Sequence, residues 1–192
     1  MAPKTKFSKD QIIDAAFEIA RTEGMDAITI RKVAEKLGSS IAPIYVNFKE
    51  VEELIQEVVK KTFAISKQLL LEQQSGNPFQ DIGIASIRFA KEYSVLYRDL
   101  VMRKNDYMND QEQDMGMLVN LMKQDVHLQS FADEELMEIL LKMKIFQTGL
   151  SVMVANGLLP DDFAEEQMIQ ILNSTATDII TAAYARKSGG TV

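Results

Sequence analysis

Cysteine is absent from the 192-residue chain, and histidine occurs once, as His127. Without cysteine the chain can form neither a disulfide framework nor a thiolate zinc site. One histidine cannot supply the paired Glu-x-x-His motifs of a helical di-metal site, and it is the only imidazole base for a nucleophilic triad. No glycine-rich phosphate loop or dinucleotide turn occurs either. These absences predict a protein that is not an enzyme and that needs no metal or cofactor.

Long apolar runs are also missing. None approaches the roughly 20 residues that cross a bilayer, and the opening MAPKTKFSKDQ lacks the apolar stretch of a secretory signal. We therefore expect a cytoplasmic protein with no membrane partner. Apolar residues still make up 46% of the chain, which is enough for a substantial core.

The net charge of −7 is unevenly distributed. Residues 1–50 sum to +1 and residues 51–192 to −8, and the first nine residues hold Lys4, Lys6 and Lys9 with no acid. An acidic C-terminal part would be repelled by phosphate and would confine contact with a polyanion to the N-terminal part. Asymmetry of this size is also common in globular proteins, so charge alone does not decide.

Helical periodicity runs through most of the chain, and no sustained apolar–polar alternation marks a strand. The pattern predicts an all-α fold of about nine helices. Ser8 and Gln11 form a capping box for a first helix over 9–23, which Gly24 ends. Its apolar stripe consists of Ile12, Ile13, Ala16, Phe17, Ile19 and Ala20.

Two short helices follow. Thr29 is a good N-cap for a helix over 30–37 that ends at Gly38, and Ser40 is the expected cap of a helix over 41–47 with Pro43 in its first turn. A helix this short needs tertiary support, expected from Ile44 and Phe48. Two helices joined by a tight glycine turn form a helix-turn-helix, whose second helix lies in the DNA major groove. An ordinary helical hairpin is the alternative.

The remaining helices are longer. One is expected over 49–72, and others near 79–94, 95–104, 107–126, 132–156 and 161–186. We expect a helix-turn-helix domain over 1–50, a larger helical domain for regulation and dimerisation over 51–187, and a flexible tail over 188–192.

The stretch ITIRKVAEKLGSSIAPIYVNFKEVEELI closely resembles the signature of TetR-family regulators, and the match runs from about Ser8 to Ile55. That signature is a helix-turn-helix, a Tyr shortly before a Phe, and a long fourth helix. The resemblance implies a homodimer whose two heads occupy successive major grooves of a palindromic DNA operator. It further implies a repressor that leaves the DNA when a small effector binds the helical body. The sequence itself leaves both directions of control open, release and promotion of binding.

The resemblance also implies DNA-contacting positions. Thr29 and Ser40 would point helix N–H groups at phosphates, Arg31 would reach backbone or guanine, and Tyr45 would donate to phosphate. Apolar residues on the reading helix would contact thymine methyl groups, and packing is the alternative role for Tyr45. Two positions depart from the family pattern: Asn47 stands where His is frequent, and Val51 where Lys is usual. The full expected set is Lys6, Thr29, Arg31, Ser40, Ile41, Ala42, Tyr45, Val46, Asn47 and Lys49.

Methionines and aromatic residues are spread over the expected body helices. As a group they predict an adaptable pocket for a small hydrophobic ligand, although each of them alone could be a core residue. The candidates are Phe63, Phe89, Tyr93, Met102, Tyr107, Met115, Met122 and Phe146. His127 is expected at the surface or at a helix end.

Apolar faces on the last two helices predict pairing about a two-fold axis. The expected interface residues are Phe146, Leu150, Met153, Leu172, Ala176, Ile179 and Ala183. The alternative to a DNA-binding regulator is a non-enzymatic helical dimer that acts as a protein-binding adaptor.

Overall fold

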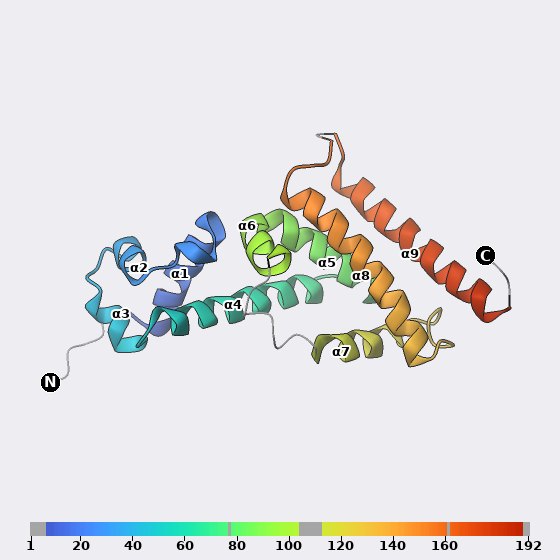
Figure 1. Cartoon of the computed structure of the whole chain (residues 1–192), viewed down its shortest axis with the longest axis horizontal. Coiled ribbons are helices and arrows are strands. Elements are labelled where there is room, and N and C mark those ends of the chain that lie inside the picture. Colours follow the sequence, from blue (N-terminus) through green and yellow to red (C-terminus); the bar gives the residue numbers. More distant parts are fainter. Residues whose placement is uncertain (1–6, 77, 104–112, 161, 190–192) are drawn as a thin grey trace. The chain divides into compact units, whose positions relative to one another are not determined.

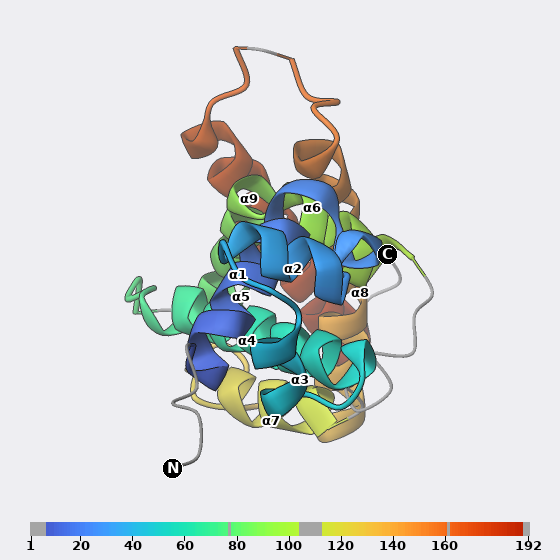
Figure 2. The same ribbon diagram turned by 90° about the vertical axis from the view of Figure 1, so that its left-hand side faces the viewer.

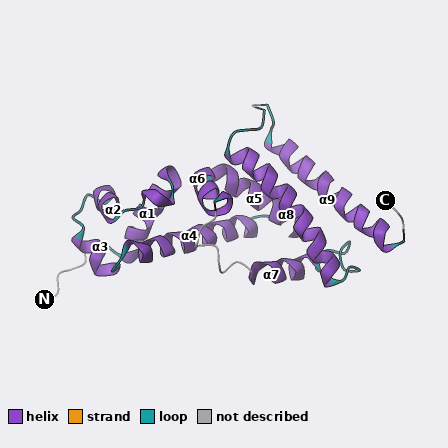
Figure 3. Ribbon diagram, in the orientation of Figure 1, coloured by secondary structure: helices purple, strands orange, loops and turns teal. Residues whose placement is uncertain are grey.

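The computed structural model describes residues 7–76, 78–103, 113–160 and 162–189, and these contain helices and loops but no strand (Figure 3). The predicted all-α class is confirmed, with nine α-helices in the described residues. They are α1 (Lys9–Glu23), α2 (Ile30–Lys36), α3 (Ala42–Asn47), α4 (Val51–Leu71), α5 (Pro78–Glu92), α6 (Ser94–Tyr97), α7 (Gln113–Met122), α8 (Asp133–Ala155) and α9 (Glu165–Lys187) (Figure 1). A 3-10 turn, η1 (Met25–Ala27), and a π-helical turn, η2 (Arg98–Met102), complete them.

The chain forms two compact units. The first takes its described residues from 1–67 and 93–107, and the second from 68–92 and 108–192. This division differs from the expected boundary after residue 50, because α4 is tied to α1 by the ion pairs Lys9–Glu57 and Lys61–Asp14. The buried Leu54 of α4 also belongs to this unit's core.

Helix α1 begins and ends where its sequence predicts. The Ser8 hydroxyl accepts a hydrogen bond from the Gln11 N–H at 3.2 Å, and the Gln11 side chain accepts one from the Ser8 N–H at 2.9 Å. Gly24 has a φ of 97°, which favours glycine and ends the helix. All six residues of the predicted apolar stripe are buried.

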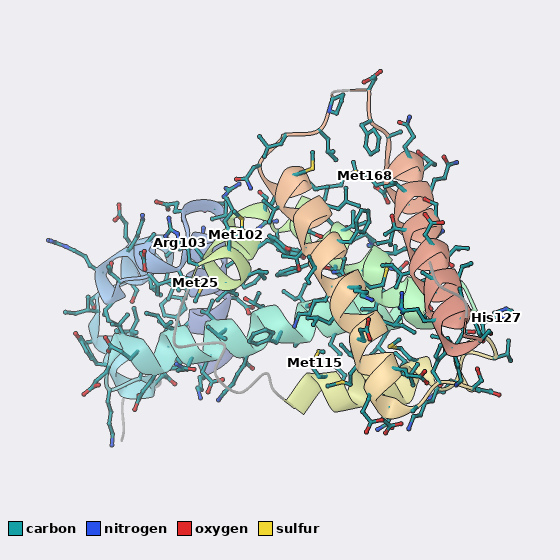
Figure 4. All side chains as sticks on the ribbon, turned by 45° about the vertical axis from the view of Figure 1, so that its right-hand side comes forward. Met25, Met102, Arg103, Met115, His127 and Met168 are labelled. Atoms are coloured by element: carbon teal, nitrogen blue, oxygen red, sulfur yellow. The ribbon has the colours of Figure 1, made fainter. Side chains whose placement is uncertain are left out.

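The segment α6–η2 packs on α1 within the first unit. Asp99 accepts a hydrogen bond from the Met25 N–H at 2.7 Å, and the rings of Phe17 and Tyr93 lie 6.2 Å apart. Figure 4 shows Met25 near Met102, the last residue of this segment, and Arg103, which follows it. The sequence predicts one helix over 95–104, but the structure has the single turn of α6 followed by the π-helical turn.

The second unit contains α5, α7, α8 and α9 around one apolar core. Its buried members are Ile87, Val119, Met122, Leu128, Phe131, Leu136, Ile139, Leu140, Met143, Leu150, Met168, Leu172 and Ala183. Helices α8 and α9 form an antiparallel pair, whose connecting loop stands out in Figure 2. A side chain in the first turn of each helix accepts a hydrogen bond from the backbone N–H just before that helix. Glu135 accepts from the Ala132 N–H before α8, and Gln167 accepts from the Ala164 N–H before α9.

Two expected segments extend beyond the described residues. The helix expected over 107–126 is described from Gln113, and the expected tail over 188–192 is described as far as Gly189. None of the described helices is long and apolar enough to cross a membrane.

Candidate nucleic-acid interface

The short helix α3 has one buried and one exposed face. Ile44 is fully buried and Phe48, which follows the helix, is 2% exposed, so these two anchor it as predicted. On the other face Ile41 is 47% exposed, Tyr45 52% and Val46 71%, and Ala42 is exposed as well. Several apolar side chains exposed together on one face can mark an interaction surface.

The start of α2 follows the prediction, but the start of α3 does not. Thr29 caps α2, and its hydroxyl accepts a hydrogen bond from the Lys32 N–H at 3.2 Å. The expected cap Ser40 is displaced by one residue: Ile41 occupies the cap position, without a side-chain hydrogen bond. The reason is that Ile41 already has helical angles, φ −71° and ψ −20°, and its carbonyl accepts the first helical hydrogen bond from Ile44. Ser40 is therefore exposed in the turn before the helix.

Several described cations of the first unit are ion-paired, but Lys67 on α4 and a group around α2 and α3 are not. Lys32 pairs with Glu23 and Arg21 with Glu18. Arg31, Lys36 and Lys49 are exposed and form no ion pair with any described residue. Since their charges are not neutralised by carboxylates, these three side chains can bind an anion such as phosphate.

Three further positions that the resemblance singles out are Asn47, Val51 and Lys6, and none of them offers an exposed, unpaired cation in the described residues. Asn47 is half-buried, and its amide donates to the Pro43 carbonyl at 2.9 Å, inside α3. Val51 begins α4, so no ammonium group is present there. Lys6 lies outside the described residues.

On α4, Glu57 receives two lysines at its Oε1 atom, Lys9 and Lys60, both at 3.3 Å. The hydrogen bond from Lys60 has the largest effect. Together with Lys9 it outweighs the opposing effect of burial and holds the pKa of Glu57 below its ordinary value. The carboxylate is therefore ionised at neutral pH. It pairs with Lys9 of α1 and Lys60 of α4, so these two lysines do not belong to the group of unpaired cations around α2 and α3.

The second unit contains a cavity of about 480 Å³ between α5, α8, α9 and the loop before α8. Buried Leu140, Met143 and Leu172 give it an apolar wall. Its polar lining residues are Gln80, Asp125, His127, Lys144, Gln147, Asn173, Thr177, Thr181 and Tyr184. The cavity therefore has apolar and hydrogen-bonding surfaces together.

His127, in the loop before α8, and Tyr184, on α9, both line this cavity. The Tyr184 hydroxyl donates to the His127 carbonyl, and the His127 N–H donates to Asp125 at 2.8 Å. The His127 side chain is exposed, as expected, and Figure 4 shows it beside the C-terminal end of α9.

None of the described residues predicted to form a ligand pocket lines this cavity. Phe63, Tyr93 and Met102 belong to the first unit, while Phe89, Met115, Met122 and Phe146 belong to the second. Phe89 and Met122 are buried, and Met115 and Phe146 pack against the second unit's core. Tyr107 lies outside the described residues.

The predicted dimer residues also separate into two groups. Leu150, Leu172 and Ala183 are buried within the single chain and offer almost no surface to a partner, which corrects their assignment. The reason is intrachain packing: Leu172, for example, lies directly over Gly83 of α5. Met153 is exposed, and the other three, Phe146, Ala176 and Ile179, are half-buried.

Exposed apolar side chains instead follow a different line on α8. Met137, Leu141 and Ile145 are all exposed, and their four-residue spacing places them on one face. We name these three residues the α8 stripe. One turn further along, a Cβ atom added at Gly149 would meet nothing within 4 Å. The i, i+4 spacing of these three residues is visible in the sequence. The neighbouring face of α8 is also apolar, so the spacing alone does not show which face stays exposed.

Lys36 is another residue that the sequence reasoning missed. It lies in the last turn of α2, five positions after Arg31. Lys36 stands out because it forms no ion pair with a described carboxylate, and this can be seen only in the folded chain.

Comparison with known proteins gives a family match over the N-terminal part. Residues 12–58 match the model of the bacterial regulatory proteins of the tetR family. No curated protein matches the chain. The matched range includes α1, α2, α3 and the first turns of α4, and thus the exposed face of α3.

Solved structures share the fold at low sequence identity. A transcriptional regulator from Rhodococcus sp. Rha1 is 14% identical with a TM-score of 0.69, covering 92% of this chain and 97% of its own. The fatty acid degradation regulator FadR from Bacillus halodurans is 14% identical with a TM-score of 0.62, covering 90% and 94%. A TetR variant from Acinetobacter baumannii AYE, solved in complex with minocycline, is 17% identical with a TM-score of 0.59, covering 92% and 96%.

The matched residues and the shared fold confirm the resemblance stated from the sequence. Residues 12–58, which contain the helix-turn-helix, match the tetR family of bacterial regulatory proteins, and the chain as a whole shares its fold with solved transcriptional regulators.

Proposed function

We propose that the protein is a homodimeric transcription repressor that binds a palindromic DNA operator and is released when a small molecule binds its second unit. The single observation that carries the DNA-binding part is the exposed face of α3 beside the unpaired cations Arg31, Lys36 and Lys49. Phosphate contacts position such a protein and the reading helix selects the sequence. Binding to the genome would place the protein in the cytoplasm.

The test is selection of binding sites from a pool of random duplexes with the purified full chain, followed by a mobility-shift assay. Enrichment of one palindromic sequence, bound more tightly than a scrambled duplex of equal length, supports the proposal. Palindromy is expected because a two-fold dimer presents the same head twice. A pool without enrichment contradicts it and favours the protein-binding adaptor.

The α8 stripe supports dimerisation. A row of large apolar residues that the chain itself leaves exposed becomes buried when two copies pair about a two-fold axis. The open space at Gly149 would let the two α8 helices approach closely. Met153 is exposed on the same helix, so we place it in the proposed interface as well.

We assign the effector to the cavity between α5, α8 and α9. Its mixture of apolar and polar lining favours a ligand that has both kinds of surface, rather than the purely hydrophobic ligand expected from the sequence. The minocycline complex of the Acinetobacter baumannii protein supports the idea that this fold can hold a small molecule.

Lys144 gives this assignment a test. Six of the seven Lys and Arg residues in the described part of the second unit are ion-paired, and the seventh, Lys144, lines the cavity without an ion pair. Compounds that release the wild-type protein from its operator should be screened, and the best one titrated against Lys144→Met. Weaker release with unchanged operator affinity supports the assignment. Equal release by both proteins contradicts it.

We propose no catalytic role. The chain has one histidine and no cysteine, and no cluster of potential metal ligands occurs in the described residues.

A further inference from the structure

The exposed face of α3 is almost devoid of hydrogen-bonding groups. Among residues 41–47, four side chains are exposed: Ile41, Ala42, Tyr45 and Val46. Only Tyr45 among them has a polar atom, and its hydroxyl stands at the end of a long ring. A helix that reads bases through hydrogen bonds would instead present amide, guanidinium or carboxylate groups here.

The polar residues next to this face do not compensate. The Asn47 amide N–H group is used by the Pro43 carbonyl within α3, and the side chain is half-buried. Ser40 precedes the helix, in the turn. Arg31, exposed on α2, lies outside this face and could reach either a phosphate or a guanine edge.

Base pairs in the major groove differ in one apolar feature, the C5-methyl group of thymine. Contact between this methyl group and an aliphatic side chain removes apolar surface of both from water, whereas cytosine and the purines offer no such group at their major-groove edge. An isoleucine and a valine at opposite ends of one exposed face can therefore distinguish thymine from cytosine without a hydrogen bond.

We propose that α3 selects its operator mainly through thymine methyl groups, with Ile41, Ala42 and Val46 as the specificity-determining residues. This rests on the proposed DNA-binding function and adds the chemistry of the recognised sequence. The unpaired cations Arg31, Lys36 and Lys49 supply the phosphate contacts that hold the face in the groove. Each operator half-site then carries thymines at two or more positions that face α3, on either strand.

The experiment uses the duplex selected by the full chain and replaces its thymines one at a time by deoxyuridine. This base keeps every hydrogen bond of the pair and lacks only the methyl group. We expect affinity to fall by about fourfold at each thymine that faces α3, the factor for one buried methyl-sized group. Replacements elsewhere in the duplex serve as controls and should leave affinity unchanged.

Val46→Ala provides the matched protein variant, because Val46 is 71% exposed and its truncation does not disturb the core. At the thymine next to residue 46, the preference for thymine over deoxyuridine should shrink toward one. At the other thymines the preference should persist.

Two results would overturn the methyl readout while leaving DNA binding intact: equal affinity for every deoxyuridine duplex, or selected half-sites without thymine opposite α3. Failure to bind any duplex would overturn the proposed function, and the methyl readout with it.

Discussion

The two compact units differ in what they do with charged and apolar side chains at their surfaces. In the first, Arg31, Lys36 and Lys49 around a short helix form no ion pair with any carboxylate of the described residues. The second pairs its described cations with acids, except for Lys144, and exposes the apolar α8 stripe instead. One unit is therefore suited to a polyanion and the other to an apolar partner, so changes in each should affect different measurements.

The largest effect is expected from removing unpaired cations of the first unit. The double variant Arg31→Ala/Lys49→Ala should bind the selected duplex about 100-fold more weakly, because a charged hydrogen bond contributes about 1.5 kcal/mol or more. Fluorescence anisotropy with the labelled duplex measures this change. Arg186→Ala is the control, since Arg186 is paired with Glu138 in the second unit. An equal loss of affinity in the control would remove the contrast between the units.

A charge on the α8 stripe should act on assembly. Ile145 is 66% exposed in the single chain, and Ile145→Glu places a carboxylate in the proposed interface. We expect about 2 kcal/mol or more of lost association free energy, and hence a monomer at micromolar concentration. Sedimentation velocity gives the oligomeric state. Gln170→Glu adds the same charge at an exposed position of α9, and that variant should remain dimeric. A dimeric Ile145→Glu protein would mean that the chains pair elsewhere.

Loss of a single tyrosine hydroxyl should have a smaller effect, on operator affinity at Tyr45 and on thermal stability at Tyr184. Tyr45→Phe should weaken operator binding about fivefold by removing one hydrogen bond to phosphate, and should leave the dimer folded. Tyr184→Phe removes the hydrogen bond to the His127 carbonyl, so it should lower the thermal stability of the second unit and leave operator affinity alone. Mobility shifts and thermal melts on both variants test this pair. Unchanged affinity in Tyr45→Phe would assign that ring to packing.

The smallest effect concerns Glu57, whose pKa is lowered in the folded chain. A carboxyl group whose pKa is lower in the folded than in the unfolded chain stabilises the fold at pH values above its unfolded pKa. This stabilisation is lost as the pH falls through the pKa of the folded state. Because the pair is near the surface, Glu57→Gln should cost about 0.5 kcal/mol or less at neutral pH, and the difference from wild type should vanish in acid. Urea unfolding at several pH values measures it. A difference that grows in acid would contradict the role of Lys60 and Lys9.

Sequence reasoning succeeded where local chemistry determines the structure. The bounds of α1 follow from Ser8, Gln11 and Gly24, which act within a few residues of the chain. The burial of Ile44 and Phe48 follows from the tertiary support that a helix as short as α3 requires. The start of α3 was misplaced by one residue, because the backbone after Gly38 already turns helical at Ile41.

The second unit was harder to predict because periodicity identifies an apolar face but not its neighbour. Leu172 and Ile145 both lie on apolar faces, yet Leu172 packs over Gly83 and Ile145 remains exposed. The cavity arises from the spacing between α5, α8 and α9, which composition does not encode. The methionines and aromatic residues expected to line a pocket are instead distributed over both units.

Binding of DNA through the unpaired cations of the first unit is tested by the affinity of the full chain for its selected duplex across a series of salt concentrations. Counterion release predicts that the logarithm of the association constant falls linearly with the logarithm of salt concentration, with a slope of about −0.9 for each phosphate contact. We expect a steep slope that becomes shallower by about two units in Arg31→Ala/Lys49→Ala. An affinity that does not depend on salt, or a slope that this double variant leaves unchanged, would contradict it.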